Sequence, residues 1–252
     1  MVRFYTFVPR GVWWPYHFYT YFRQEDIWSG DYEHAICDTG VGLLFNHRNM
    51  RDYPEFFFER YIAFAKQVTK KVGDGKVTFV IPDYPADYHD GKCRSAEDNV
   101  ERTLRNIERF ISIDGIDWLP VIQAPYLDIE GFRESCRLTR KLIGSYPKVA
   151  IGTVCKTNKL DFIVKCCKIA RQYFPSSWIH AFGLTLKALP HVAHLIDSFD
   201  TTAWTKLREP GKPSAKNQTQ RIEYFKAYLA KVQQILAKAK SSQLTSFLGL
   251  HS

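Results

Sequence analysis

Five apolar runs along the chain each end in a polar residue or a glycine. Four of these ends carry a carboxylate or a side-chain amide, and the fifth carries a glycine. In a parallel α/β barrel the carboxyl ends of all strands meet at one face, so these ends are expected to converge on one polar pocket. The runs are Ala35–Asp38, Thr78–Asp83, Leu119–Gln123, Lys148–Gly152 and Leu195–Asp200.

Helical patterns separate these runs. A cap and first-turn pair, Asp52 and Pro54, precedes apolar residues at helical spacing, and Ser95 forms a capping-box pattern with Asp98. Further strands are expected at Trp178–Leu184 and Ser198–Trp204. The predicted helices run from Pro54 to about Gly73, Ser95 to Ile111, Glu130 to Ile143 and Leu160 to Tyr173.

The alternation of strands and helices indicates the fold class. Roughly 30 residues separate Gln123 from Gly152 and Gly152 from Gly183, which suits one strand–helix–strand step. We therefore predict an α/β fold in which residues 1–252 form a single (β/α)8 TIM-type barrel domain. An open doubly wound sheet has the same alternation, but no G-x-G-x-x-G sequence follows any strand, which weakens a dinucleotide-binding fold.

Two segments lie outside this alternation. Arg3–Pro9 has the pattern of a first strand, and the aromatic segment Gly11–Asp31 has no clean period. The aromatic segment is either a packed loop or in part a stacking surface for bases, and packing is the simpler interpretation. A C-terminal amphipathic helix is predicted at Gln218–Lys240, with lysines opposite its apolar face. Such a face is usually solvated, although it can also follow a phosphate backbone.

Composition fits this picture. Apolar residues make up 45% of the chain and aromatic residues 15%, which is ample for a large core. The formal net charge of +9 makes a nucleic-acid partner plausible, while solubility alone is the simpler explanation of the charge. Its six cysteines form no C-x-x-C pair, and most lie in apolar patterns. We expect a soluble, cytoplasmic protein, because Met1–Tyr5 opens no signal peptide and no apolar run approaches a membrane span.

The candidate chemistry lies at the ends of the predicted strands. Asp38, Asp83, Asp197 and Asp200, together with Gln123, are the candidates. Carboxylates gathered in one pocket can divide acid, base and nucleophile roles when their pKa values differ. Each aspartate alone would more simply be a helix cap or turn former. The expectation therefore rests on the five residues together.

These ends resemble, in order, motifs of the tRNA-guanine transglycosylase superfamily, which includes DNA-acting relatives that insert 7-deazaguanines. The resemblance covers about residues 34–204. Asp38–Val41 resembles D-S-G-G, and Asp83–Asp87 resembles the F-D-E-C-T-P-Y-P-A-D segment. Val121–Gln123 resembles the segment with a base-binding glutamine. Ala150–Thr153 resembles G-L-A-V-G, and Asp197–Asp200 resembles D-x-F-D.

The resemblance implies a role for each matched residue. Asp200 would be the nucleophile and Asp38 the general acid and base. Asp83, Gln123 and the Gly152 amide would bind the edge of the purine. Further contacts to the substrate are expected from Thr153 and Asp197.

The resemblance also implies contacts to a nucleic acid. The target base must leave its stack to reach such a pocket. It would then lie between aromatic rings, for which the candidates are Tyr84, Tyr88, Tyr126 and Trp204. The residues expected to hold phosphates are Lys156, Lys206, Arg208 and Lys212.

The chain departs from the family in three places, and the smallest departure is the missing cysteine of D-E-C. No cysteine follows Cys167, so the family's C-x-C-x-x-C…H zinc site is missing and no metal or other cofactor is expected. Thr201–Thr205 replaces the P-T-R-x-A-R-N-G stretch that holds tRNA. The surface on which relatives dimerise lies in the zinc region, so we expect a monomer.

Several functions fit these observations. The favoured hypothesis is a pentosyltransferase that exchanges guanine in DNA for a free 7-deazaguanine base. A tRNA-guanine transglycosylase that works with a partner subunit is the second. A catalytically silent nucleic-acid-binding barrel is the third, although it would need neither Asp38 nor Asp200. An unrelated small-molecule lyase or hydrolase is the fourth, since fold alone does not decide function.

Overall fold

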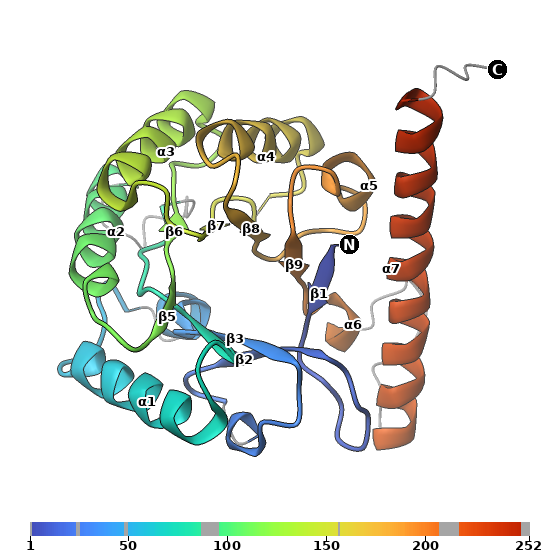
Figure 1. Ribbon diagram of the computed structural model, residues 1–252, viewed down its shortest axis with the longest axis horizontal. Coiled ribbons are helices and arrows are strands. Elements are labelled where there is room, and N and C mark those ends of the chain that lie inside the picture. Colours follow the sequence, from blue (N-terminus) through green and yellow to red (C-terminus); the bar gives the residue numbers. More distant parts are fainter. Residues whose placement is uncertain are drawn as a thin grey trace.

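The computed structural model has an α/β architecture with parallel sheets (Figure 1). It describes residues 2–23, 26–47, 50–86, 96–155, 157–206 and 217–247. In these ranges the strands are β1 (Arg3–Tyr5), β2 (Tyr16–Thr20), β3 (His34–Asp38), β4 (Val77–Val80), β5 (Asp117–Leu119), β6 (Val121–Ile122), β7 (Lys148–Ile151), β8 (Trp178–Ala181) and β9 (Ser198–Asp200). The helices are η1 (Ile27–Ser29), η2 (Leu43–His47), α1 (Phe57–Val72), α2 (Ala96–Ile111), α3 (Ile129–Ile143), α4 (Leu160–Tyr173), α5 (Leu189–Val192), α6 (Ala203–Lys206) and α7 (Gln218–Phe247).

The described strands form two sheets in which every pairing is parallel. One sheet has the order β1-β9-β8-β7-β6, and the other has the order β2-β3-β4-β5. The sheets meet at two junctions. Only Pro120 separates β5 from β6, and Thr6, directly after β1, pairs with β2 through the amide of Phe18 at 2.9 Å. The expected (β/α)8 barrel requires the sheet to continue through both junctions.

A chain of polar side chains crosses from one sheet to the other in the space between the strands. The Tyr5 hydroxyl lies 2.8 Å from His34 Nδ1, and His34 Nε2 lies 3.1 Å from Thr78 Oγ1. Thr78 donates to the Asp117 carboxylate, which also accepts from Lys148 Nζ at 2.5 Å. Burial, followed by the Lys148 charge, lowers the pKa of His34 to about 4. Side chains from β1, β3, β4, β5 and β7 therefore face the same interior space.

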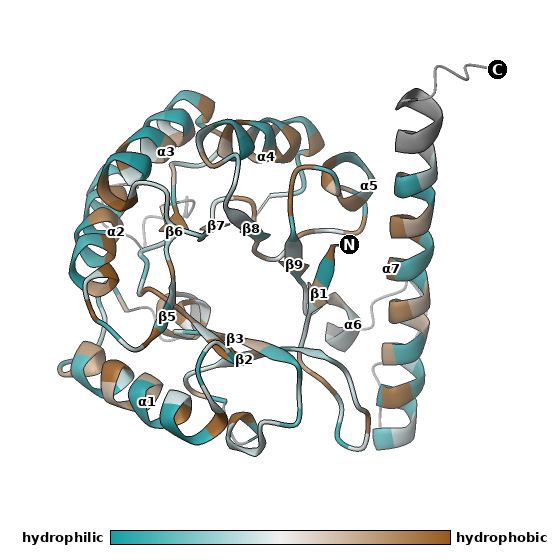
Figure 2. Ribbon diagram, viewed as in Figure 1, coloured by the Kyte–Doolittle hydropathy of each residue, from teal (hydrophilic) through white to brown (hydrophobic). Residues whose placement is uncertain are grey.

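The helices cover the outer faces of the strands. Figure 1 shows α1 to α5 around the strands and α7 along one side, next to α5 and α6. Apolar and polar residues alternate along these helices (Figure 2). One of two large apolar clusters packs α1 and α2 on the β2–β5 sheet, and the other packs α3, α4 and α5 on the β6–β9 sheet. A third, interior cluster includes Tyr5, Phe18, Ile36 and Leu119.

The aromatic N-terminal segment contains a strand that the sequence pattern did not reveal. Tyr16–Thr20 forms β2 and pairs with β3 in parallel register. Both of its faces pack against protein: Phe18 contacts the interior cluster, whereas Tyr19 contacts the α1 side. Because both faces are covered, the hydrophobic alternation expected of a half-exposed strand is absent. The segment is packed, as the simpler interpretation predicted, but these five residues form a strand and not a loop.

Several predicted boundaries also differ. Helix α1 begins at Phe57 rather than at Pro54, because Asp52 does not cap it and instead pairs with Arg102 at 2.5 Å. The strand expected at Ser198–Trp204 ends at Asp200, and Trp204 lies in the short helix α6. Helix α7 continues to Phe247, beyond the predicted end at Lys240. The proposed cap Ser95 lies outside the described residues.

None of the helices in the described ranges combines the length and the apolar composition that a membrane-spanning helix needs. The described residues include five cysteines. Cys37, Cys136, Cys166 and Cys167 are buried, whereas Cys155 is exposed.

Candidate functional site

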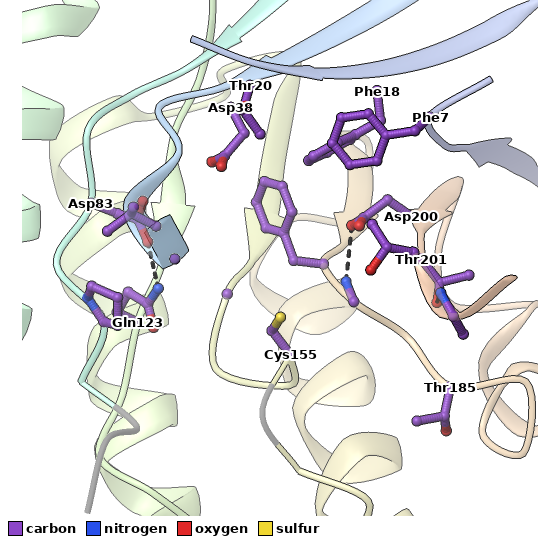
Figure 3. A pocket seen from close by; sticks show the side chains of 18 of the residues that line it. Phe7, Phe18, Thr20, Asp38, Asp83, Gln123, Cys155, Thr185, Asp200 and Thr201 are labelled. Carbon is purple, nitrogen blue, oxygen red and sulfur yellow. Dashed lines mark hydrogen bonds between the residues drawn. The ribbon is translucent and has the colours of Figure 1, made fainter. Parts of the chain in front are cut away.

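One cavity of about 800 Å³ opens at the carboxyl ends of the strands. Four of the predicted residues line it with their side chains: Asp38, Asp83, Gln123 and Asp200. They come from four different strands. Asp38 and Asp200 are the last residues of β3 and β9, Gln123 directly follows β6, and Asp83 follows β4 after two further residues. In Figure 3 Asp83 and Gln123 lie on one side of the cavity, Asp200 lies on the other, and Asp38 points in between them.

Asp83 and Gln123 form a buried pair. Gln123 Nε2 donates to Asp83 Oδ2 at 2.6 Å, and the exposed fractions of Gln123 and Asp83 are only 5% and 4%. Burial raises the pKa of Asp83 to about 6, and the hydrogen bond from Gln123 opposes that rise. The backbone carbonyl of Asp83 accepts from the Tyr53 hydroxyl at 2.8 Å, which fixes the loop after β4. The pair is thus held in one orientation before anything binds.

Gln123 also carries an unsatisfied acceptor. Its Oε1 atom is buried and has no hydrogen-bond partner within the described part of the chain. A buried amide oxygen without a partner costs about 1–3 kcal/mol relative to one that is hydrogen-bonded. An N–H donor on a ligand would satisfy this oxygen.

Asp38 carries a carboxyl whose pKa lies near neutrality. Burial, with the Asp83 carboxylate as the second cause, raises the pKa of Asp38 to about 7. The Gly40 amide donates to Asp38 Oδ2 at 2.9 Å and partly opposes that rise. A carboxyl with a pKa near 7 can give up and take back a proton at neutral pH, as a general acid and base must.

One oxygen of Asp200 has two hydrogen-bond partners. The Gly183 amide donates to Asp200 Oδ1 at 2.9 Å, and His180 Nε2 lies 3.3 Å from the same atom. Asp200 is 7% exposed, so most of its surface is covered. Its carboxylate is therefore oriented from within the protein while it lines the cavity.

Gly152 lines the cavity but does not present its amide to a ligand. Its N–H donates to the carbonyl of Ile122 at 3.0 Å, within the sheet. The expectation that this amide binds the base is therefore not supported. Glycine matters here because a Cβ atom at this position would overlap Gln123 Nε2 and would lie 2.8 Å from Val121 Cγ1. Gly152 thus makes room for the Gln123 amide.

Two further predicted residues are bound within the protein instead. Thr153 is buried and donates to the carbonyl of Ala124 at 3.0 Å. Asp197 precedes β9 at the opposite end of that strand from Asp200, where its Oδ2 accepts from Arg171 at 2.7 Å and from the Ile179 amide at 2.8 Å. Neither is among the described residues that line the cavity. Both contacts are structural, so the prediction of substrate binding by Asp197 and Thr153 is not supported.

Three of the four rings predicted to sandwich the base lie in the described ranges, and none of the three lines the cavity. Trp204 is 5% exposed, donates to Thr6 Oγ1 at 2.7 Å and packs on Phe225 of α7, so it is a core residue. Tyr84 is buried under the Arg102 guanidinium. Tyr126 does not line the cavity, and Tyr88 lies outside the described residues.

The rings that do line the cavity come from other elements. They are Phe7, Phe18, Phe182 and Tyr228. Of these, Phe182 directly follows β8, and a period of two over Trp178, His180 and Phe182 could have placed it on the inner face. No comparable signal pointed to Tyr228, which reaches the cavity from α7.

Most of the predicted phosphate-binding residues fall in parts of the chain that the structure does not describe. Lys156, Arg208 and Lys212 lie outside the described residues, and only the backbone of Lys206 is described, at the end of α6. The described residues contain no group of three or more histidine, cysteine or acidic side chains that could hold a metal ion.

Comparisons of the sequence with protein-family models and with curated proteins find no match. The resemblance to the transglycosylases therefore rests on the short sequence motifs alone.

Proposed function

We propose that this protein is a base-exchange transglycosylase that replaces guanine in DNA with a 7-deazaguanine base. One observation carries the proposal: Asp38, Asp83, Gln123 and Asp200, far apart in sequence, line a single cavity. The resemblance to the tRNA-guanine transglycosylase superfamily assigns complementary roles to these four residues. A binding module would need neither a carboxyl with a pKa near 7 nor a second, oriented carboxylate.

The proposal includes a closed (β/α)8 barrel. Two features support closure: the junction at Pro120 and the pairing of Thr6 with β2. The polar chain from Tyr5 to Lys148 supports it further, because side chains from both sheets share one interior. In a closed barrel all the strand ends that carry the site lie on one face.

The base would bind at Asp83 and Gln123. The edge of guanine and of 7-deazaguanines carries a ring N–H and an exocyclic amine, which are donors for the Asp83 carboxylate and for Gln123 Oε1. The Gln123 amide oxygen would thereby gain its missing partner. A base without these donors would leave buried acceptors unpaired, and sites of this kind discriminate strongly.

The exchange would proceed in two displacements at the sugar C1′ carbon. In the first, an Asp200 oxygen forms a bond to C1′, the bond from C1′ to the guanine nitrogen breaks, and Asp38 donates a proton to the departing base. In the second, Asp38 takes a proton from the incoming base, whose nitrogen attacks C1′ and releases the Asp200 carboxylate. The sequence of steps parallels that of retaining glycosidases.

The test is incorporation of radiolabelled guanine, and then of 7-cyano-7-deazaguanine, into duplex DNA and separately into bulk tRNA. We expect label in DNA, together with a protein–DNA adduct on denaturing gels, and loss of both in Asp200→Asn. Asp114→Asn, an exposed aspartate on the loop before β5, is the matched control and should behave as wild type. Label in tRNA alone would favour the tRNA-acting alternative. Label and adduct in neither would overturn the proposal.

A further inference from the structure

A buried histidine lies directly behind the proposed nucleophile. His180 on β8 is fully buried, at 0% exposed. Its Nε2 atom lies 3.3 Å from Asp200 Oδ1, and its Nδ1 atom lies 2.8 Å from Ser198 Oγ. No motif in the sequence pointed to this residue, and none of the roles assigned above uses it.

The strand register produces this arrangement. Ser198 and Asp200 are two residues apart on β9, so their side chains point to the same face. The parallel register places His180 opposite Ser198. Its ring can therefore contact the serine on one side and the aspartate on the other.

Aromatic neighbours fix the plane of the imidazole. Trp178 stacks on it with ring centroids 5.7 Å apart and an angle of 21° between the planes. Tyr5 and Phe182 contact it edge-on, with centroids 5.8 Å and 4.7 Å away. Because the ring is enclosed on these sides, its orientation toward Asp200 is set by the fold and needs no substrate.

The carboxylate also determines which nitrogen carries the proton. An ionised Asp200 can only accept, so Nε2 must be the donor, and Nδ1 then accepts from the Ser198 hydroxyl. The resulting chain runs from the Ser198 O–H to Nδ1 and from Nε2–H to Asp200 Oδ1. The Gly183 amide donates to the same oxygen at 2.9 Å. Both hydrogen bonds from the described residues to the Asp200 side chain, from His180 and from Gly183, therefore end on Oδ1.

We propose that His180 is a positioning residue for Asp200: it holds Oδ1 and leaves Oδ2 to attack the sugar. This inference rests on the proposed function. In the covalent intermediate Oδ2 is bonded to C1′ and Oδ1 is the ester carbonyl oxygen. When the incoming base attacks, the C1′–Oδ2 bond breaks and its electron pair returns to the carboxylate. His180 keeps its proton throughout.

The two donors on Oδ1 therefore act unequally on the two steps. Hydrogen bonds to an ionised group are stronger than those to a neutral one. They stabilise the free carboxylate more than the ester, so they favour its departure from the sugar. Loss of the His180 donor should consequently slow release of the adduct more than its formation.

The kinetic test compares adduct formation and adduct release in rapid-quench experiments with labelled duplex DNA. In His180→Phe, which keeps a ring but has no donor, we expect release by added guanine to slow about 10- to 100-fold and the adduct to accumulate. His180→Gln places an amide donor near the position of Nε2 and should recover part of the release rate. His191→Gln, an exposed histidine on α5, is the control and should match wild type.

Several outcomes would overturn the inference. Equal slowing of both steps in His180→Phe, or no slowing at all, would show that the donor to Oδ1 does not assist release. A His180→Gln variant that folds as wild type does and recovers nothing would indicate a packing role only. Should His180→Phe fail to fold, His180→Gln and Ser198→Ala carry the same comparison.

A second measurement does not depend on activity. Nitrogen NMR of the histidine side chains reports which ring nitrogen is protonated, and we expect Nε2–H for His180 at neutral pH. An Nδ1–H tautomer would overturn the inference by itself. If wild-type protein forms no adduct on any nucleic acid, the proposed function fails, and the tautomer alone decides whether His180 holds Asp200.

Discussion

The side-chain amide of Gln123 donates to Asp83 Oδ2 at 2.6 Å, and its own carbonyl oxygen is left buried without a partner among the described residues. The donor half of the amide is satisfied by protein and the acceptor half is not. A site of this kind selects a ligand that carries hydrogen-bond donors.

Replacing Asp83 with asparagine should weaken base binding. The new side-chain amide would be a second donor facing the Gln123 amide, so the charge-assisted hydrogen bond between the two residues would be lost. The carboxylate that would accept hydrogen bonds from the base would be lost as well. We expect the KM for the free base to rise about 10- to 100-fold, with a smaller change in kcat. The measurement is steady-state exchange of guanine and 7-cyano-7-deazaguanine, with Asp114→Asn as the matched control. Unchanged uptake and unchanged base choice would contradict our assignment of Asp83.

The protonation of Asp38 predicts a pH dependence of the exchange reaction. Burial raises the pKa of Asp38 to about 7, and the acid form is needed when guanine departs. The rate of adduct formation should therefore fall as the pH rises through about 7. The measurement is the rate of adduct formation as a function of pH, over about three to four pH units around neutrality, from about 5.5 to 9. A rate that stays flat across this range would exclude Asp38 as the acid.

The same group predicts an effect on stability. The pKa of Asp38 is raised in the folded state, so between about pH 4 and pH 7 the folded protein binds more protons than the unfolded chain. Its contribution to the free energy of unfolding is therefore lost as the pH rises through that window. Asp38→Asn cannot ionise, so its stability relative to wild type should increase by roughly 2–4 kcal/mol between pH 4 and pH 8. Urea unfolding at both pH values measures this, and a pH-independent difference would contradict it.

Gly152→Ala should disturb the Gln123 amide. The added Cβ would overlap Gln123 Nε2, so the amide must move away from Asp83. We expect loss of base uptake and a decrease in stability of about 1–3 kcal/mol. Gly42→Ala serves as the stability control, because nothing lies within 4 Å of an added Cβ there. Thermal unfolding of both variants and base exchange by Gly152→Ala test this, and wild-type exchange in Gly152→Ala would show that Gln123 can be displaced without consequence.

Trp204→Phe should reduce stability and leave DNA binding intact. The substitution removes the 2.7 Å hydrogen bond from the indole of Trp204 on α6 to Thr6 Oγ1, which directly follows β1. The expected cost is about 1–2 kcal/mol in the free energy of unfolding. Urea unfolding and DNA-binding isotherms at one fixed salt concentration would separate the two effects. A marked drop in DNA affinity without loss of stability would restore Trp204 as a nucleic-acid contact.

The sequence by itself determined the α/β character and most of the candidate site. Apolar runs at regular intervals predicted β3, β4, β6, β7 and β9, and the polar residues at their ends predicted Asp38, Asp83, Gln123 and Asp200. The strands and the meeting of these four side chains at one cavity are confirmed, because they need only two local facts: an apolar run forms a buried strand, and parallel strands end at a common face. The chemical roles of the four residues stay predictions.

Only the tertiary structure decided which atoms of that site are available. The amide of Gly152 is used within the sheet, and the carboxylate of Asp197 is used by Arg171. The register of β8 on β9 placed His180 beside Asp200, and α7 brought Tyr228 to the cavity from a distant part of the chain. Each of these outcomes depends on which partner a group meets across the sheet or from another helix. A local hydrophobic pattern does not contain that information, because it records whether a residue is buried and not what it is buried against.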